Sequence, residues 1–144
     1  MESNQKNQLI SSWLSFTHVQ MKVTDELESI LQQNHQLSLK EFYVLLFLSE
    51  TPEKKLKLQQ LQSMVGLSQS AMSRLVSRFE AKGCGALKRH ICVDDRRAIY
   101  TSLTNEGEEQ LKKALGTINE TLANAFSRED IQKELQGLIN QIKR

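Results

Sequence analysis

Six polar side chains recur on one side of a predicted helix between Ser68 and Glu80. The apolar residues of this segment, at positions 72, 75, 76 and 79, follow helical spacing and predict its buried face. The opposite face carries Gln69, Ser70, Ser73, Arg74, Ser77 and Arg78. Short hydroxyl and amide groups with two arginines can approach phosphates and the edges of DNA bases closely. An ordinary amphipathic surface helix shows the same pattern, so the segment alone leaves both interpretations open.

The residues before this helix predict a shorter helix joined to it by a tight turn. Leu58, Leu61 and Val65 have helical spacing, and Gly66 follows at the position where a left-handed residue ends a helix. Ser68 is placed to cap the next helix. A helix, a turn of about four residues and a second helix form the helix-turn-helix arrangement. The polar face is therefore expected on the second helix of that motif.

A β-hairpin with a charged tip is predicted after the second helix. Apolar and polar residues alternate from Leu87 to Ile91 and again from Ala98 to Leu103, as in half-buried strands. The tip between them, residues 93–97, is polar and basic. A hairpin that follows a helix-turn-helix makes the predicted unit a winged helix-turn-helix.

Five motifs carry a resemblance to a known family: Leu67-Ser68-Gln69-Ser70, Arg74-Leu75-Val76, Phe79-Glu80-Ala81-Lys82-Gly83, Asp95-Arg96-Arg97-Ala98 and Leu103-Thr104-Asn105-Glu106-Gly107. With these motifs the chain resembles the multiple-antibiotic-resistance regulator (MarR) family of bacterial transcription factors. The predicted helices elsewhere extend the resemblance over nearly the whole chain. It departs from the family pattern at Gly83-Cys84-Gly85, which adds about two residues before the first wing strand. This insertion can change the angle between the helix and the wing.

The resemblance implies a mainly α fold with a small β-hairpin wing: a winged helix-turn-helix with dimerisation helices at both ends. We expect one domain over residues 1–144, with the DNA-binding lobe at 38–104 and dimerisation helices at 8–33 and 105–144. In the family, the first, fifth and sixth helices intertwine across a two-fold axis. A dimer would place one recognition helix of each protomer in the major groove of a pseudo-palindromic operator, with half-sites roughly 34 Å apart.

The expected DNA contacts divide between helix and wing. In the family, the arginine that matches Arg97 enters the minor groove, where narrow A·T-rich stretches concentrate negative potential. Asp95 is expected to orient Arg97, and Arg96, Lys88 and Arg89 to contact phosphates. A solvated charged turn is the alternative for the tip. The candidate DNA-binding residues are Ser68, Gln69, Ser70, Ser73, Arg74, Ser77, Arg78, Lys88, Arg89, Asp95, Arg96 and Arg97.

Length and charge distribution agree with this interpretation. The chain has 144 residues, enough for one domain with a shared core. Its net charge is only +2, but residues 68–104 contain seven Lys or Arg against three acids, whereas the remainder contains twelve against fourteen. A basic segment on a near-neutral body is the electrostatic signature of nucleic-acid binding.

The helices at both ends have apolar stripes that the winged unit is too small to cover. The N-terminal stripe includes Leu9, Trp13 and Phe16. After this helix, Ser38 and Glu41 predict a capping box at the start of the next one. Thr104 is expected to cap a helix from residue 105, and Ser127 with Asp130 to begin a last helix. A second copy of the chain would bury the stripes. A monomeric helical cap is the alternative.

The sequence offers no pattern for catalysis, a metal or a membrane span. There is no Gly-x-Ser-x-Gly or Gly-rich phosphate loop, and no cofactor is expected. The three histidines and two cysteines lack zinc-ligand spacing. Cys84 and Cys92 lie roughly 26 Å apart along an extended strand, too far for a disulfide. With no secretion signal and no long apolar run, we expect a cytoplasmic protein.

We interpret the chain as a homodimeric, sequence-specific regulator of transcription that binds double-stranded DNA. It is interpreted as a repressor relieved by a small-molecule or oxidative signal, the latter through Cys84 or Cys92. The alternative is a winged-helix module that binds a protein and has no DNA affinity. The resemblance implies that small, often lipophilic molecules bind between the dimer helices and the lobe. Trp13, Phe16, His18, Phe42 and Tyr43 could line such a pocket, but helically spaced aromatics are also typical of a core, and no ligand residue is assigned.

Overall fold

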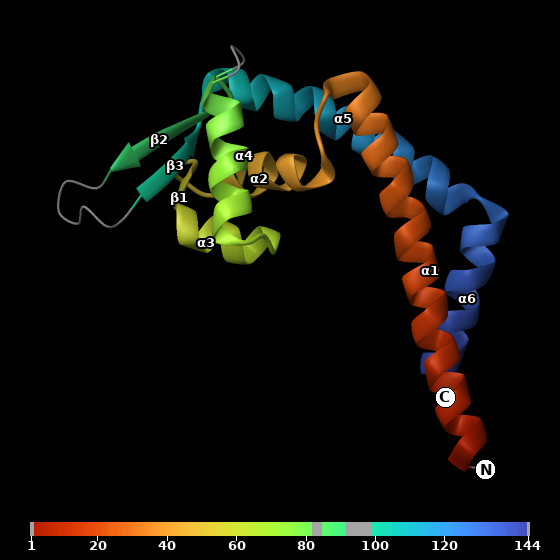
Figure 1. The fold of residues 1–144 in the computed structure, drawn as a ribbon. Helices are drawn as coiled ribbons and strands as arrows, with labels where there is room; N and C mark the ends of the chain where they lie inside the picture. Colours follow the sequence, from red (N-terminus) through yellow and green to blue (C-terminus); the bar gives the residue numbers. More distant parts are fainter. Residues whose placement is uncertain (1, 82–84, 92–98, 144) are drawn as a thin grey trace. The chain divides into compact units, whose positions relative to one another are not determined.

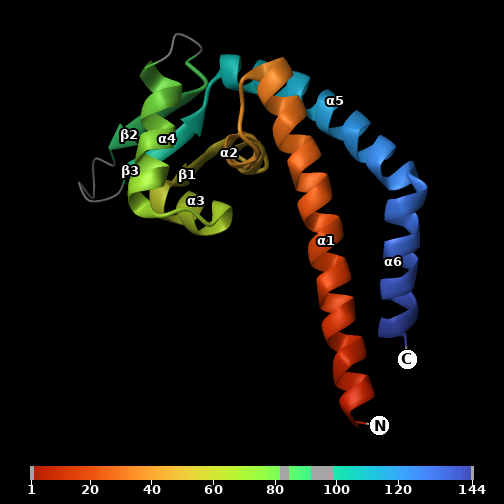
Figure 2. The same cartoon turned by 45° about the vertical axis from the view of Figure 1, so that its right-hand side comes forward.

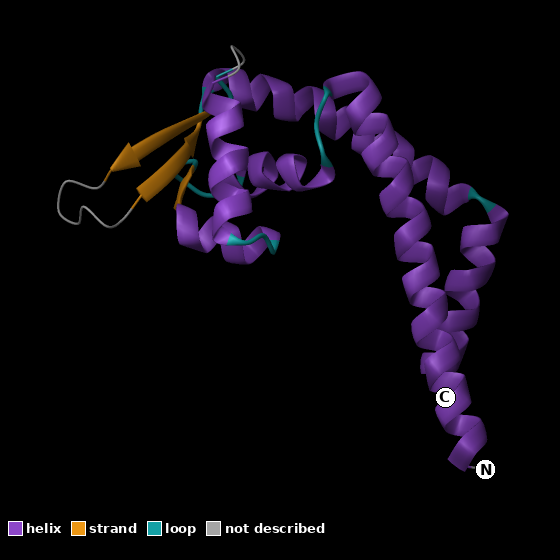
Figure 3. Cartoon of the chain, viewed as in Figure 1, coloured by secondary structure: helices purple, strands orange, loops and turns teal. Residues whose placement is uncertain are grey.

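A computed structural model describes residues 2–81, 85–91 and 99–143. The chain divides into two compact units: a central unit, residues 35–116, and a flanking unit, residues 1–34 with 117–144. The boundary falls inside helix α5 (Asn105–Ser127), so the first half of this helix belongs with the central unit. Helices with a small antiparallel sheet make up the described chain, which confirms the mainly α fold with a β-hairpin wing (Figures 1 and 3).

The central unit is built from α2 (Leu39–Ser49), α3 (Leu58–Val65), α4 (Gln69–Ala81), the start of α5 and a three-stranded sheet. The strands are β1 (Lys55–Lys57), β2 (Leu87–Ile91) and β3 (Ile99–Leu103), in the order β1-β3-β2. The hairpin of β2 and β3 was predicted, but the edge strand β1 was not. Three residues, two of them lysines, are too few to show a strand period.

The register of the hairpin faces its apolar residues toward the helices. Leu87 lies opposite Leu103, and Arg89 lies opposite Thr101. Leu87, Leu103 and Thr101 are buried, as the alternation predicted for this face. The helices contribute the rest of the core through side chains that include Val44, Leu45, Leu48, Leu61, Met72 and Val76.

Four predicted helix ends are confirmed in the central unit. The Ser38 hydroxyl accepts a hydrogen bond from the backbone N–H of Glu41, whose carboxylate accepts one from the N–H of Ser38, so the capping box is complete. Gly66 ends α3 with a φ of 77°, in the left-handed region. The Ser68 hydroxyl accepts from Ala71, and that of Thr104 from Gly107, at the starts of α4 and α5.

The flanking unit consists of α1 (Glu2–His35), the second half of α5 and α6 (Glu129–Ile142). Helix α1 extends beyond the predicted 8–33 at both ends. The predicted start of α6 at Ser127 is wrong. Ser127 is the last residue of α5, and its hydroxyl donates back to the Ala123 carbonyl. Arg128 occupies the N-cap of α6 without a side-chain capping bond.

Helices α1 and α6 lie side by side and antiparallel, as both views show (Figures 1 and 2). Polar pairs join them along their length: Ser12 with Gln141, His18 with Glu134 at 2.8 Å, Lys22 with Asp130 at 3.3 Å, and Glu26 with Arg128. Buried apolar residues, among them Val19, Val23, Leu27 and Ile131, accompany these pairs. Polar side-chain contacts therefore join α1 to α6 within a single chain.

The ion pairs at the start of α6 shift two pKa values. Partial desolvation opposes ionisation of Asp130. Hydrogen bonds from Lys22 and the Ile131 N–H, with the charges of Lys22 and Arg128, outweigh it and hold the pKa of Asp130 below its ordinary value. The hydrogen bond to Glu26 raises the pKa of Arg128. Both groups are charged at neutral pH, and their ion pairs join α1 to α6 at the surface.

Candidate nucleic-acid interface

Helix α4 has one apolar face and one polar face, as the sequence predicted. Met72, Leu75, Val76 and Phe79 are buried. The polar residues from Gln69 to Arg78 are exposed, except for half-buried Ser73. Burial of the apolar face holds the helix against the central unit and leaves the other face open to a partner.

The first two turns of this polar face carry side chains that are not used inside the chain. Gln69, Ser73 and Arg74 form no hydrogen bond or ion pair with any residue that the structure describes. Ser70 has only a long contact, 3.4 Å, with the Ser68 hydroxyl. These groups combine hydroxyl, amide and guanidinium chemistry on one short helical surface, which suits hydrogen bonding to base edges and phosphates.

The last two turns of α4 are tied to their neighbours on both sides. Arg78 Nη2 lies 2.6 Å from Glu41 Oε2, in the first turn of α2. On the wing side, Arg89 of β2 donates from Nε to Glu80 at 3.0 Å and from Nη2 to the Ser77 hydroxyl at 2.9 Å. The sequence assigned Arg78, Ser77 and Arg89 to DNA, but these contacts show that each also connects α4 to the rest of the unit.

The contacts of Arg89 show that the strand after the inserted residues is bonded to α4. Gly83 and Cys84 lie outside the described residues, as do Cys92 and the tip residues Asp95, Arg96 and Arg97. The strand β2 that follows the insertion is nevertheless bonded to α4 through Arg89, Glu80 and Ser77. Lys88, its neighbour, is exposed.

Sequence reasoning missed two acids at this interface. Glu41 was recognised only as half of a capping box, and Glu80 only as part of a motif. Their partners Arg78 and Arg89 lie in other elements, and local periodicity contains no information on such pairs. A lone acid on a helix is usually a solvated residue, so neither position carried a signal of pairing.

A groove runs along α4 beside the first turn of α2. Its volume is about 520 Å³, and it is lined by Ser38, Lys40, Leu67, Ala71, Arg74, Leu75 and Arg78. Lys40 also donates to the carbonyl of Val65 at 2.7 Å, at the end of α3. The first turn of α2 thus contacts both helices of the helix-turn-helix, and three cations border the groove.

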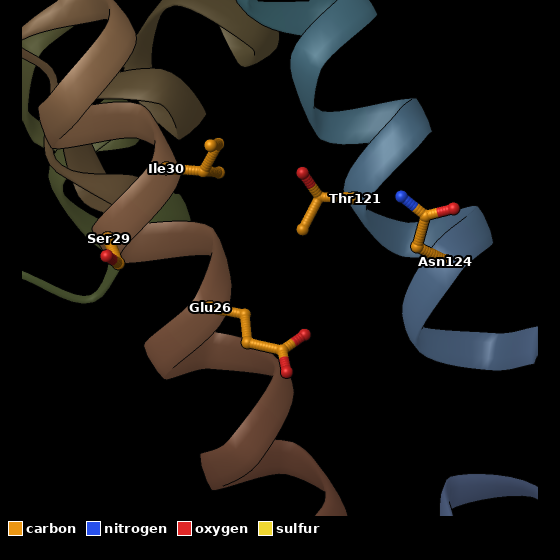
Figure 4. A pocket seen from close by; sticks show the side chains of 5 residues that line it. All are labelled: Glu26, Ser29, Ile30, Thr121 and Asn124. Atoms are coloured by element: carbon orange, nitrogen blue, oxygen red, sulfur yellow. The ribbon is translucent and has the colours of Figure 1, made fainter. Parts of the chain in front are cut away.

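A second hollow lies within the flanking unit. Side chains of α1 and of the second half of α5 border an open space of about 310 Å³, with Ile30 and Thr121 facing one another (Figure 4). It is lined by Glu26, Ser29, Ile30, Thr121 and Asn124. None of the five aromatic or histidine residues considered for an effector pocket lines it.

The five residues considered for that pocket lie elsewhere in the two units. Trp13 stacks on Phe16 along α1. Phe42 is buried and contacts Tyr43, which stacks on Phe47 in α2. Within the described residues no three histidine, cysteine or acidic side chains are grouped as metal ligands. No helix in the same residues combines the length and apolar character needed to cross a membrane.

The helix-turn-helix, its sheet and the open polar face of α4 define a winged helix-turn-helix protein. The MarR family model matches residues 35–98. The HTH-type transcriptional regulator SarZ of Staphylococcus saprophyticus is 31% identical over 93 residues, which are 61% of this chain and 62% of the relative. Over these stretches the chain is similar to transcriptional regulators of the MarR family.

Solved structures of transcriptional regulators have the same fold. Sco3205, a MarR family transcriptional regulator from Streptomyces coelicolor solved in complex with DNA, is 26% identical with a TM-score of 0.75. The match covers 96% of this chain and 86% of that one. BldR from Sulfolobus solfataricus, 23% identical with a TM-score of 0.73, matches over 100% of this chain and 99% of its own. The second likeness shows the fold alone.

Proposed function

We propose that this protein is a sequence-specific regulator of transcription that binds double-stranded DNA through α4. The observation that carries the proposal is that polar side chains on the first two turns of α4 form no bonds with other described residues. The groups of Gln69, Ser73 and Arg74 have no partner among the described residues, although the helix beneath them is fixed by burial. A fixed helix with free donors and acceptors is suited to enter the major groove.

Two further observations support DNA as the partner. The groove along α4 is bordered by Lys40, Arg74 and Arg78, so positive charge lies beside the polar face of α4 that is proposed to contact DNA. Sco3205, similar over 96% of this chain, was solved in complex with DNA. The wing residues Arg97, Asp95 and Arg96 are proposed to act as expected from the family, with Arg97 in the minor groove.

We also propose that the active form is a homodimer on a pseudo-palindromic operator. Large apolar side chains are exposed on the flanking unit of a single chain: Leu9, Ile10, Trp13, Leu14, Phe16, Met21, Phe126, Ile139 and Ile142. Covering them with a second copy would remove this apolar surface from water. Two recognition helices related by a two-fold axis then require an operator with the same symmetry.

The regulatory part of the proposal is a cytoplasmic repressor released by a small molecule or an oxidant. This part is supported by the similarity to the MarR family. The hollow in the flanking unit is lined by none of the aromatic residues considered for an effector pocket. Cys84 and Cys92, the candidates for oxidation, lie outside the described residues.

Selection of binding sites from a random duplex pool tests the proposed function. The selected sequences should converge on two inverted half-sites about one helical turn apart. Repeating the selection with candidate effectors and with peroxide should identify a signal that lowers recovery. A pool that shows no enrichment, together with retention of a protein partner, would favour a winged-helix protein-binding module.

A further inference from the structure

Glu41 is the one buried charged residue among those whose burial the structure describes. It is 6% exposed, at the first turn of α2. Removing a carboxylate from water is costly unless the charge is paired and hydrogen-bonded. A residue that retains such a group needs its charge for some interaction beyond helix capping.

The two oxygens of Glu41 have different partners. Oε1 accepts the backbone N–H of Ser38 at 2.8 Å and completes the capping box. Oε2 lies 2.6 Å from Nη2 of Arg78 on α4. Glutamine completes a capping box as well as glutamate does, so capping leaves the negative charge unexplained. The contact with Arg78 accounts for it.

Arg78 is held at one end and open at the other. Its side chain is half exposed, and a guanidinium has five N–H donors in a planar fork. Glu41 occupies a terminal nitrogen, and the exposed part retains donors for another acceptor. Arg74, one turn earlier on α4, borders the same groove. The open donors of Arg78 therefore lie beside the polar surface assigned above to DNA.

We propose that Glu41 is a positioning residue, which holds the Arg78 guanidinium so that its remaining donors bind a DNA phosphate. The proposal rests on the proposed function, because it assigns the acceptor to duplex DNA. An unpaired arginine has many rotamers and loses that freedom on binding. The buried carboxylate removes part of this cost before DNA arrives, and it fixes the direction from which the phosphate is approached.

Replacement of Glu41 by glutamine separates this role from simple electrostatics. The variant preserves the capping box and removes one negative charge from the lobe. Long-range electrostatics alone predicts tighter DNA binding, since the lobe becomes more positive. Positioning predicts the reverse: Glu41→Gln should weaken binding to the selected duplex about three- to tenfold, although the protein has gained positive charge.

A double-mutant cycle with Arg78→Ala shows whether Glu41 acts through Arg78. In the Arg78→Ala background, Glu41→Gln should have no further effect on affinity. Thr51→Ala, which removes a hydrogen bond to the Leu48 carbonyl at the end of α2 in the same unit, is the control for a loss of stability alone and should bind as the wild type does. Urea unfolding and circular dichroism on each variant establish that the compared proteins are folded.

Each outcome decides the assignment. If the wild type binds no duplex, the proposed function fails and this assignment fails with it. If the wild type binds and Glu41→Gln binds equally or more tightly, only the positioning role is overturned. If Glu41→Gln weakens DNA binding equally in the wild-type and the Arg78→Ala backgrounds, the positioning role is also overturned, because the effect would then be structural. If Glu41→Gln does not fold, the variant Arg78→Lys tests the proposal instead, because Arg78 is half exposed. It should lose affinity as Arg78→Ala does, because lysine lacks the fork that serves two acceptors, and wild-type binding by it would overturn the proposal.

Discussion

The polar residues of α4 divide into two groups with different tasks. Gln69, Ser73 and Arg74 are unpaired within the described chain and are available to read DNA. Ser77 and Arg78 bond to neighbouring elements and fix the position of the helix. A reading surface needs both, because side chains discriminate between bases only when the backbone that carries them is held in place.

Arg74 is the residue with the clearest expected effect on specificity. If its guanidinium binds a guanine through two hydrogen bonds, Arg74→Ala should cost about 1–3 kcal/mol and relax the preference at that base pair. Competition binding against a set of single-substituted operators measures both effects. Lys112→Ala removes the same charge from the exposed side of α5 and should preserve the base preference. An equal loss on every sequence would assign Arg74 to a phosphate.

Arg97, outside the described residues, carries the expected minor-groove contact. Arg97→Ala should weaken operators with A·T-rich flanks more than those with G·C-rich flanks, since the narrow groove of A·T stretches attracts the guanidinium. Asp95→Ala should produce a milder form of the same defect. Affinities on the two kinds of flank measure it. If Arg97→Ala shows no loss on either flank, the wing does not bind DNA in this protein.

At the scale of elements, Gly107 lies where the start of α5 passes close to the backbone before β2. A Cβ at this position would lie 2.3 Å from the Ala86 carbonyl oxygen and 2.6 Å from Leu103 Cδ1. The first turn of α5 therefore approaches the backbone before β2 too closely for any side chain. Thr104, which caps the same turn, donates from its backbone N–H to the Ala86 carbonyl and from its hydroxyl to the Gly85 carbonyl.

Two glycines of α5 give opposite predictions for alanine. Gly107→Ala must displace backbone and should lower the free energy of unfolding by about 1–3 kcal/mol. Gly116→Ala meets no atom within 4 Å and should raise it by about 0.5–1 kcal/mol, because alanine is the better helix former. Urea unfolding of both variants measures the difference. A shift of the same sign for both would contradict the close approach at Gly107.

The elements show where sequence reasoning succeeds and where it stops. The apolar periods of α4 and of the hairpin predicted the buried faces, because local spacing determines which side chains share a face. Ser38, Gly66 and Thr104 revealed helix ends through local capping chemistry. The strand β1 was too short to show a period, and Ser127 was mistaken for a cap. The Arg78–Glu41 and Arg89–Glu80 pairs join distant segments, so no local pattern revealed them.

For the whole molecule, the exposed apolar residues of the flanking unit predict a homodimer. Trp13 is 66% exposed in the single chain, so Trp13→Asp should not disturb the fold of one protomer. It should dissociate the dimer, because a charge would be buried without a partner in the interface. Sedimentation velocity at micromolar concentration measures the assembly, with Gln59→Asp on α3 as the control. A well-folded wild-type monomer at that concentration would contradict the prediction.

The dependence of operator affinity on salt tests the central claim most directly. Fluorescence anisotropy with a selected duplex and a scrambled duplex, over a range of salt concentrations, gives the slope of log affinity against log salt. A dimer that neutralises roughly six to ten phosphates should show a slope of about −5 to −9, and the selected duplex should stay the tighter ligand throughout. Affinity that does not change with salt, or that is equal for both duplexes, would contradict the account.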